Sequence, residues 1–401
     1  MKVVPYPYRA RAWWGEAIVA ESDSCLCLEK DGEPSVLYFP QADINLSKFG
    51  AGSAQSSSEE GEVRSVDGQD LLTVFPGPSG PLGEHGAFDS ERVRIEVYDR
   101  RPGDDERNVT FKRFPTWGDA SDLIDLMNVR PDGDLAYVSG AHSDGRRPVV
   151  EGSQMLGQAI VAAGRHAPGR RAVSAHMVFL RGADARRPLR FELQELSAGR
   201  TFTGLTVQAT QGGRCCAAGT LLCDAIAPPL LSHAAPAPDV PGPYECPPCD
   251  MGVTGRDIRV VDGAYTNDPD APAGPPVLDS WVRFHEVPDD PVLHAGLLAQ
   301  FTGHMSIAAA LRPHDGIGQA AAHRTLSMGI NAISLSLHRE VHADDWMLYH
   351  HLSTFAGDGM THSECRVHAE SGALLASFTV DAMVRPFPDG PAVARDERTA
   401  L

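Results

Sequence analysis

Two side chains in this sequence, Glu151 and His304, are suited to taking a proton from a water molecule. Glu151 comes directly before the apolar stretch "GSQMLGQAIVAA", which predicts a helix. A carboxylate there can polarise water beside the free N–H groups of the first helical turn. His304 lies in a Gly-rich turn at the expected start of a second helix, and an imidazole titrates near neutral pH. Both positions therefore predict general acid–base chemistry.

Each of these two residues also has a purely structural interpretation. The helix dipole favours a carboxylate at the position of Glu151 whether or not that carboxylate reacts. A single histidine such as His304 often does no more than complete the hydrogen bonds of a buried region. The sequence leaves both interpretations open.

Polar and small residues at the same helix starts extend the predicted site. Gln154 and Gln158 lie four residues apart on one helix face, where Gln154 can orient water or a carbonyl and Gln158 can equally serve packing. Close approach of a substrate is expected at Gly152 and Ser153 at the start of the first helix, and at Thr302 and Gly303 at the start of the second. Backbone N–H groups at a helix start favour negative charge that develops on a carbonyl oxygen.

The composition excludes several classes of function. A net charge of −18 argues against general binding to nucleic acid, which requires clustered Lys and Arg. Residues 165–190 nevertheless form a local basic island, in which Arg186 and Arg187 can bind phosphate through paired hydrogen bonds. No run approaches the ~20 apolar residues of a membrane span. The eight scattered cysteines suit a reducing compartment, so we expect a soluble cytoplasmic protein.

The sequence predicts neither a cofactor nor a metal ion. A Gly-rich nucleotide-binding fingerprint is absent from it. The "CPPC" at Cys246 to Cys249 has the spacing of half a zinc site, but no second pair of ligands lies nearby.

Patterns along the chain predict five segments. Short strand-like runs indicate a mostly-β accessory domain of unknown function over residues 1–112. Residues 113–227 and 279–386 each contain a helix followed by strands, which indicates a diverged duplication. The Pro/Ala-rich residues 228–278 predict a linker between the two halves, and residues 387–401 predict a flexible tail.

The sequence motifs of both halves resemble those of the type II acyl-CoA thioesterases. In the first half the matching motifs are "GSQMLGQA" at 152–159, "FLR" at 179–181 and "GRTF" at 199–202. In the second half they are "LAQFTGHMSIAAALRPH", "LSLHREVHADDWMLYHHLS" and "GALLASFTVDAMVR". Over residues 114–386 the resemblance implies an α+β double hot-dog fold, in which two antiparallel sheets each wrap a helix. The start of the chain, "WWGEAIVAESDS … YFPQADI", resembles a small β-rich bacterial domain of uncharacterised function, sometimes labelled nucleotidyltransferase-like.

The polar catalytic triad of that family is not retained in this chain. Aligning the motifs places the family's Asp, Thr and Gln at Gly303, Ile330 and Val380. In each case the next residue is polar, namely His304, Asn331 and Asp381. Because a shift of one residue turns a strand side chain to the other face, Asn331 and Asp381 can replace the family residues only where a bulge restores the direction.

The resemblance implies hydrolysis of an acyl-CoA or acyl-carrier-protein thioester by activated water. Glu151, His304 and Asp381 are then the candidate bases, Gln154 and Asn331 orient water or the carbonyl, and the arginines of the basic island meet the CoA phosphates. Two alternatives stay open: a non-catalytic acyl-thioester binding protein, and an enoyl-thioester hydratase. The family also implies a possible homo-oligomer.

Overall fold

The computed structural model divides into two compact units, Met1–Thr116 and Trp117–Leu401, close to the boundary expected after residue 112. It describes residues 2–387, apart from residues 7, 30–34, 52–60, 67, 76, 78–79, 91, 100–106, 110–117, 142–148, 250–252, 254, 267–270 and 323–324. The expected tail, 387–401, falls outside these described residues except for its first residue.

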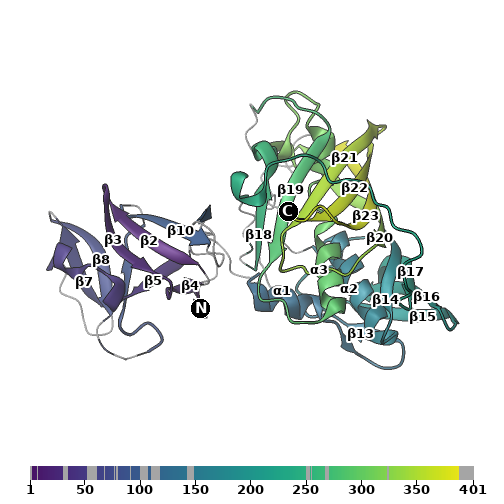
Figure 1. Cartoon of the computed structure of the whole chain (residues 1–401), viewed down its shortest axis with the longest axis horizontal. Helices are drawn as coiled ribbons and strands as arrows, with labels where there is room; N and C mark the ends of the chain where they lie inside the picture. Colours follow the sequence, from purple (N-terminus) through teal and green to yellow (C-terminus); the bar gives the residue numbers. More distant parts are fainter. Residues whose placement is uncertain are drawn as a thin grey trace. The chain divides into compact units, whose positions relative to one another are not determined.

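The first unit is built from strands in its described part, as the alternating apolar runs predict (Figure 1). A seven-stranded sheet has the order β1-β4-β5-β9-β8-β7-β6, and a four-stranded sheet has the order β11-β10-β2-β3. The strands are β1 (Lys2–Pro5), β2 (Arg9–Trp14), β3 (Ala17–Ser22), β4 (Leu26–Glu29), β5 (Val36–Pro40), β6 (Gly50–Ala51), β7 (Glu62–Val66), β8 (Gln69–Phe75), β9 (His85–Phe88), β10 (Arg94–Asp99) and β11 (Arg107–Val109), with short 3-10 turns at Gln41–Asp43 and Leu46–Lys48. Phe39, Leu71 and Val97 lie in its core.

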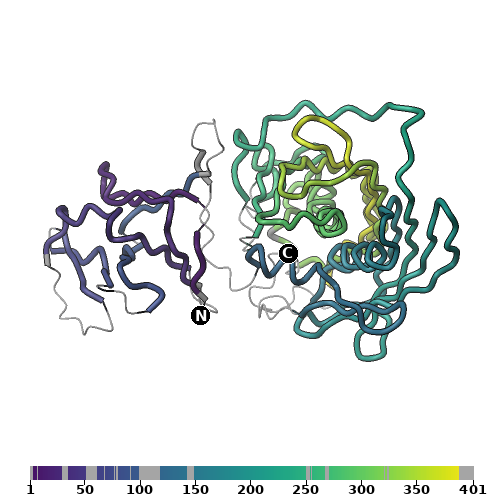
Figure 2. Tube along the Cα trace, turned by 60° about the horizontal axis from the view of Figure 1, so that its bottom comes forward, coloured from purple at the N-terminus to yellow at the C-terminus, as the bar shows by residue number. Residues whose placement is uncertain are grey.

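The second unit contains one twelve-stranded antiparallel sheet of order β12-β13-β15-β16-β17-β14-β20-β23-β22-β21-β19-β18. Its strands are β12 (Arg130–Pro131), β13 (Ala136–Val138), β14 (Arg171–Phe179), β15 (Arg190–Ala198), β16 (Phe202–Gln211), β17 (Arg214–Asp224), β18 (Arg256–Val260), β19 (Val277–Phe284), β20 (Leu326–Leu337), β21 (Met347–Gly357), β22 (Met360–Ala369) and β23 (Leu374–Pro386). Its helices are α1 (Ala120–Met127), α2 (Gly152–His166), α3 (Pro291–Phe301) and α4 (Ser306–Leu311), with 3-10 turns at Pro243–Glu245, Val261–Gly263 and Gln319–Ala321. The sheet curves around α2, α3 and α4, whose coils lie inside it in Figure 2.

The strand order shows the expected duplication. The first half runs β12-β13-β15-β16-β17-β14, and the second runs β18-β19-β21-β22-β23-β20, so each strand has a counterpart in the same place. The two halves meet at β14 and β20, which pair antiparallel from Ser174 with Ser336 to Val178 with Ala332. The two sheets that the sequence predicts are therefore joined edge to edge into one.

Helices α2 and α3 cross antiparallel at very short range. A Cβ atom added to Gly157 would lie 2.5 Å from the carbonyl oxygen of Gly296, and one added to Gly164 would lie 2.7 Å from Val292. Arg165 near the end of α2 pairs with Asp290, the residue that caps the start of α3. The start of α2 consequently lies beside the end of α3.

The second helix begins earlier than the sequence analysis expected. Asp290 accepts a hydrogen bond from the N–H of Val292, and Pro291 occupies the first helical position, both of which favour a helix start there. Helix α3 ends at Phe301, and the chain bends through the left-handed Met305 (φ 67°) before α4. Thr302 and Gly303 thus lie in the break between α3 and α4, not before the first turn of one long helix.

The predicted linker contributes a strand to the sheet. Within residues 228–278, β18 pairs with β19 from Arg256 with Phe284 to Val260 with Ser280. Ile258 and Val260 are buried in the main core. The alternation of apolar residues in "RDIRV" is the strand signal that the surrounding Pro and Ala obscured.

Burial also affects the titration of histidines in the second half. His351 on β21 is fully buried, and its Nδ1 faces the carbonyl oxygen of Leu278 at 3.3 Å. Desolvation lowers the pKa of His351 from 6.5 to about 4, and lowers the pKa of His294 and His368 in the same direction. These side chains therefore enter the folded interior uncharged.

The crossing of α2 and α3 predicts the effect of a small substitution. Gly157→Ala should lower the free energy of unfolding by about 1–3 kcal/mol, because the added methyl group overlaps the backbone of α3. In an exposed helix the same substitution usually raises the free energy of unfolding, because Ala has a higher helix propensity than Gly. Gly204→Ala is the control, since a Cβ there meets nothing within 4 Å. Urea denaturation measures both, and equal stabilities would contradict the close crossing.

The buried histidine predicts acid sensitivity. In the unfolded chain His351 binds a proton below about pH 6.5, whereas in the folded protein it does so only near pH 4. The stability that neutral His351 allows is therefore fully present above pH 6.5 and is lost as the pH falls towards 4. Between these limits the loss reaches on the order of 3 kcal/mol. His351→Phe should flatten the dependence of unfolding free energy on pH, and the exposed His233→Gln should not. Identical slopes in wild type and His351→Phe would contradict this assignment.

Candidate active site

The start of α2 and the break between α3 and α4 form one cluster. A Cβ added to Gly303 would come within 2.5 Å of Ser153 Oγ and 3.0 Å of Ile330 Cδ1. The ring of Phe179, at the end of β14, covers Gly152 on the first turn of α2. Residues from both halves of the duplication therefore meet at a single point.

A carboxylate and an imidazole face each other in this cluster. Glu151 Oε2 lies 3.5 Å from His304 Nε2. Glu151 is the residue that precedes the first turn of α2, yet its side chain makes no capping hydrogen bond to that turn. Its side chain is 20% exposed, whereas that of His304 is 1% exposed. Water can thus reach the carboxylate more readily than the imidazole.

A buried guanidinium group completes the cluster. Arg256, at the start of β18, places Nη2 3.2 Å from His304 Nε2 and donates from Nη1 to Gln300 Oε1 at 2.8 Å. The ring of Phe301 stacks on the ring of His304 at 4.4 Å. The hydroxyl of Tyr349 donates to the carbonyl oxygen of Leu298 and thereby supports the same turn of α3.

The arrangement can carry out acid–base chemistry at a carbonyl group. The first N–H groups of α2, at Gly152 and Ser153, have no acceptor within the helix and favour negative charge. Glu151 lies directly before them and can polarise a water molecule held at the same place. A proton acceptor and donors for an oxyanion are therefore side by side.

Five of the residues expected from the sequence meet in this cluster: Glu151, Gly152, Ser153, Gly303 and His304. Gln154 follows in the first turn of α2 and is buried. Thr302 donates a hydrogen bond to the carbonyl oxygen of Ala299 at the end of α3, and Gln158 donates one to the carbonyl oxygen of Leu126 in α1. Both side chains therefore have structural roles.

Asn331 and Asp381 are not brought to the cluster. Asp381 lies on the outer face of β23, where its carboxylate contacts His362 Nδ1 at 2.7 Å and its side chain is 50% exposed. A bulge between Ile330 and Ala332 leaves Asn331 exposed while Ile330 packs towards Gly303. The bulge does not turn the polar residue inwards, although replacement of a family residue by Asn331 would require that direction. We therefore no longer assign either residue to the site.

Arg186 and Arg187 lie on the loop after β14, near the approach to α2. The backbone of Asp184 on this loop forms an isolated antiparallel β-bridge with Val149, which lies two residues before Glu151. Arg186 forms an ion pair with Asp184, and its hydrogen bonds lower the pKa of that partly exposed carboxyl group. Arg187 extends over the turn at Gly212.

Sequence reasoning missed Arg256 and Gln300. Arg256 lies in the segment taken for a linker, and only the short alternation of "RDIRV" could have indicated a strand. Gln300 lies in the helix whose start was expected later. Gln300 belongs to the motif "LAQFTGHMSIAAALRPH", but nothing in that motif indicates its contact with Arg256, because both residues reach the cluster through long-range packing.

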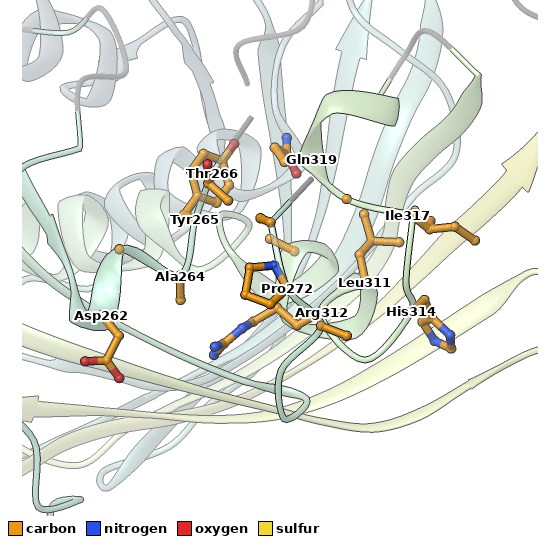
Figure 3. A pocket seen from close by; sticks show the side chains of 16 residues that line it. Asp262, Ala264, Tyr265, Thr266, Pro272, Leu311, Arg312, His314, Ile317 and Gln319 are labelled. Carbon is orange, nitrogen blue, oxygen red and sulfur yellow. The ribbon is translucent and has the colours of Figure 1, made fainter. Parts of the chain in front are cut away.

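Helix α4 connects the cluster to a cavity of about 170 Å³ (Figure 3). His304 comes two residues before α4, and Leu311 at its end lines the cavity together with Arg312, Tyr265 and Pro272. Among the described residues, no three His, Cys, Asp or Glu side chains are arranged to hold a metal ion. Within the same residues, no helix has the length and apolar character needed to cross a membrane.

The chain matches family models in both halves of the second unit. Residues 143–223 match the acyl-CoA thioesterase N-terminal domain, and residues 223–384 match the C-terminal domain. Acyl-coenzyme A thioesterase 8 of Homo sapiens is 24% identical over 277 residues, which are 59% of this chain and 81% of the relative. Acyl-CoA thioesterase 2 of Haemophilus influenzae is 24% identical over 283 residues, which are 66% and 97%.

Solved structures of the same fold align with about two-thirds of the chain. An acyl-CoA thioesterase II of Mycobacterium marinum has a TM-score of 0.57 at 24% identity and covers 67% of this chain and 99% of its own. A hot-dog protein of Alicyclobacillus acidocaldarius has a TM-score of 0.53 at 15% identity, with coverage of 66% and 97%. The expected double hot-dog fold is confirmed. The two domain models together span more than half of the chain, and the protein belongs to the acyl-CoA thioesterase family.

Proposed function

We propose that this protein hydrolyses acyl-CoA thioesters to a free acid and CoA, with Glu151 as the base. The observation that carries the assignment is the contact of Glu151 with His304 at the start of α2, 3.5 Å between Oε2 and Nε2. This contact supplies a proton acceptor in a family member whose usual polar triad positions hold Gly303, Ile330 and Val380.

The proposed reaction has two steps. The oxygen of a water molecule bonds to the thioester carbon while Glu151 takes a proton from that water. The N–H groups of Gly152 and Ser153 stabilise the oxyanion that forms. The carbon–sulfur bond then breaks, and the proton passes from Glu151 to the departing thiolate. One water is consumed for each acid and thiol released.

Glu151 is a better base than His304 for reasons of access. Its side chain is 20% exposed and precedes the helix N–H groups, whereas the imidazole is 1% exposed and is covered by Phe301. His304 then limits the position of the carboxylate by packing beside it, with its Nε2 3.5 Å from Glu151 Oε2.

The assignment predicts a large loss when the base is removed. Glu151→Gln keeps the shape of the side chain but cannot take a proton, so kcat should fall by about 100-fold or more. Free thiol released from short to long acyl-CoAs measures the rate. Asp381→Asn is the matched control, because that carboxylate is paired on the outer face of β23 and should leave the rate unchanged.

Three outcomes would contradict parts of the proposal. Saturable binding of acyl-CoA without release of thiol would indicate a binding protein. Formation of a hydroxyacyl product from an enoyl-CoA at a higher rate would indicate a hydratase. A larger loss in His304→Gln than in Glu151→Gln would make the imidazole the base.

We also propose that Arg186 and Arg187 bind the phosphates of CoA. Arg187→Ala should raise KM for an acyl-CoA about tenfold, since a charge-assisted hydrogen bond contributes about 1.5–3 kcal/mol. It should not change KM for the matching acyl-pantetheine, which lacks the nucleotide. Arg200→Ala, an exposed arginine at a different turn, is the control. An equal effect on both substrates would place the phosphates elsewhere.

A further inference from the structure

Arg256 is a cation enclosed within the candidate site. The residue is 3% exposed, and its guanidinium carbon lies 5.3 Å from the centre of the Phe301 ring. Two of its nitrogens reach different partners, Nη1 to Gln300 Oε1 at 2.8 Å and Nη2 to His304 Nε2 at 3.2 Å. Such a buried fork is held in a single orientation, because both arms are engaged.

The contact with Arg256 determines which nitrogen of His304 carries hydrogen. A guanidinium group donates hydrogen bonds and accepts none. His304 Nε2 must therefore accept through its lone pair, and in the neutral ring the hydrogen lies on Nδ1. With its lone pair engaged, Nε2 is not available to take a proton from water.

The charges around His304 act in opposite directions, because the Arg256 guanidinium opposes protonation of the ring and the Glu151 carboxylate favours it. Among the described residues, the titratable and charged groups that face its ring include Glu151 before α2, Arg256 on β18 and, behind Phe301, Tyr349 on β21. Burial raises the pKa of Tyr349, so its hydroxyl stays neutral. A neutral imidazole between one carboxylate and one guanidinium leaves the cluster with no net charge. A protonated imidazole would place two cations in contact inside the protein.

We propose that Arg256 is a positioning residue that keeps His304 a hydrogen-bond acceptor, so that the Glu151 carboxylate, not the imidazole, takes the proton from the attacking water. The inference rests on the proposed hydrolysis for its chemical consequence, but the state of His304 can be observed without turnover. Arg256 acts through His304 and Gln300 and does not itself touch the reacting atoms.

The first experiment reads the imidazole directly. Nitrogen-15 NMR of histidine-labelled protein distinguishes a ring nitrogen that carries hydrogen from one that accepts, and His304→Gln assigns the signal by its loss. We expect wild-type His304 to show hydrogen on Nδ1 and a bare Nε2 between pH 6 and 8. In Arg256→Gln, Nε2 should take up a proton within this range. A wild-type ring with hydrogen on Nε2 would overturn the proposal.

The second experiment is a double-mutant cycle on kcat with one acyl-CoA. Arg256→Gln and His304→Gln should each lower kcat by about 100-fold through misplacement of Glu151, with less change in KM. Because Arg256 acts through His304, the double variant should lose no more than the worse single variant. Losses that multiply would show that the two residues act independently and would overturn the proposal.

The dependence of rate on pH separates positioning from general loss of structure. Arg256→Gln should gain a decline in kcat/KM below about pH 6.5, the range of an unperturbed imidazole, and this decline should vanish in the double variant. Wild type should lack it. A variant that is only less stable would keep the wild-type profile at a lower level, an outcome that also counts against the proposal.

Arg256→Lys keeps the experiment decisive if Arg256→Gln fails to fold. Lysine keeps the buried charge but replaces the fork by a single nitrogen, so it cannot hold both Gln300 and His304 in the same geometry. We expect a folded protein by circular dichroism with kcat lowered about tenfold, intermediate between wild type and Arg256→Gln. An unchanged kcat and an unchanged His304 signal would contradict the role of the fork. If wild type shows the expected tautomer but releases no thiol, the proposed hydrolysis fails while the assignment of Arg256 to His304 holds.

Discussion

The antiparallel crossing of α2 and α3 is the constraint on which the candidate site depends. Gly157 and Gly296 let the two helix backbones approach without an intervening side chain, since a Cβ at Gly157 would lie 2.5 Å from the carbonyl oxygen of Gly296. The antiparallel direction then places Ser153, at the start of α2, against Gly303, just after α3. Without this approach, the residues before one helix and after the other would lie in separate halves of the fold.

The duplication offers two such meeting points, and the chain uses them differently. At one, the start of α2 meets the end of α3 and holds Glu151 beside His304. At the other, the end of α2 meets the start of α3, and Arg165 forms an ion pair with Asp290. The second carboxylate accepts a hydrogen bond from the first turn of its own helix, while Glu151 makes no such capping hydrogen bond and faces an imidazole. The duplication relates the two ends of the α2–α3 pair, but only one end carries the candidate catalytic residues.

The apolar replacements at the family's triad positions are consistent with this distribution. Ile330 packs towards Gly303, and Val380 is buried in the core, so the sheet offers an apolar wall at both positions. The polar groups of the cluster come instead from helix ends and from β18. Arg256 joins them because β18 adds to the edge of the sheet and carries its first residue inwards, beside Gln300.

Local sequence determined much of this protein before any packing is considered. The helix over α2, the alternating strands, the duplication and the family could all be predicted, because they depend on periodicity and on motifs that neighbouring residues carry together. Glu151 and His304 could be named as candidates by their positions near helix ends. Their contact could not be predicted, nor could Arg256 or the exclusion of Asn331 and Asp381. These depend on a helix start twelve residues before Gly303, on one bulge in β20 and on a strand within a Pro-rich segment. Only the tertiary structure decides them, since the atoms involved are brought together by packing between segments that lie far apart in the chain.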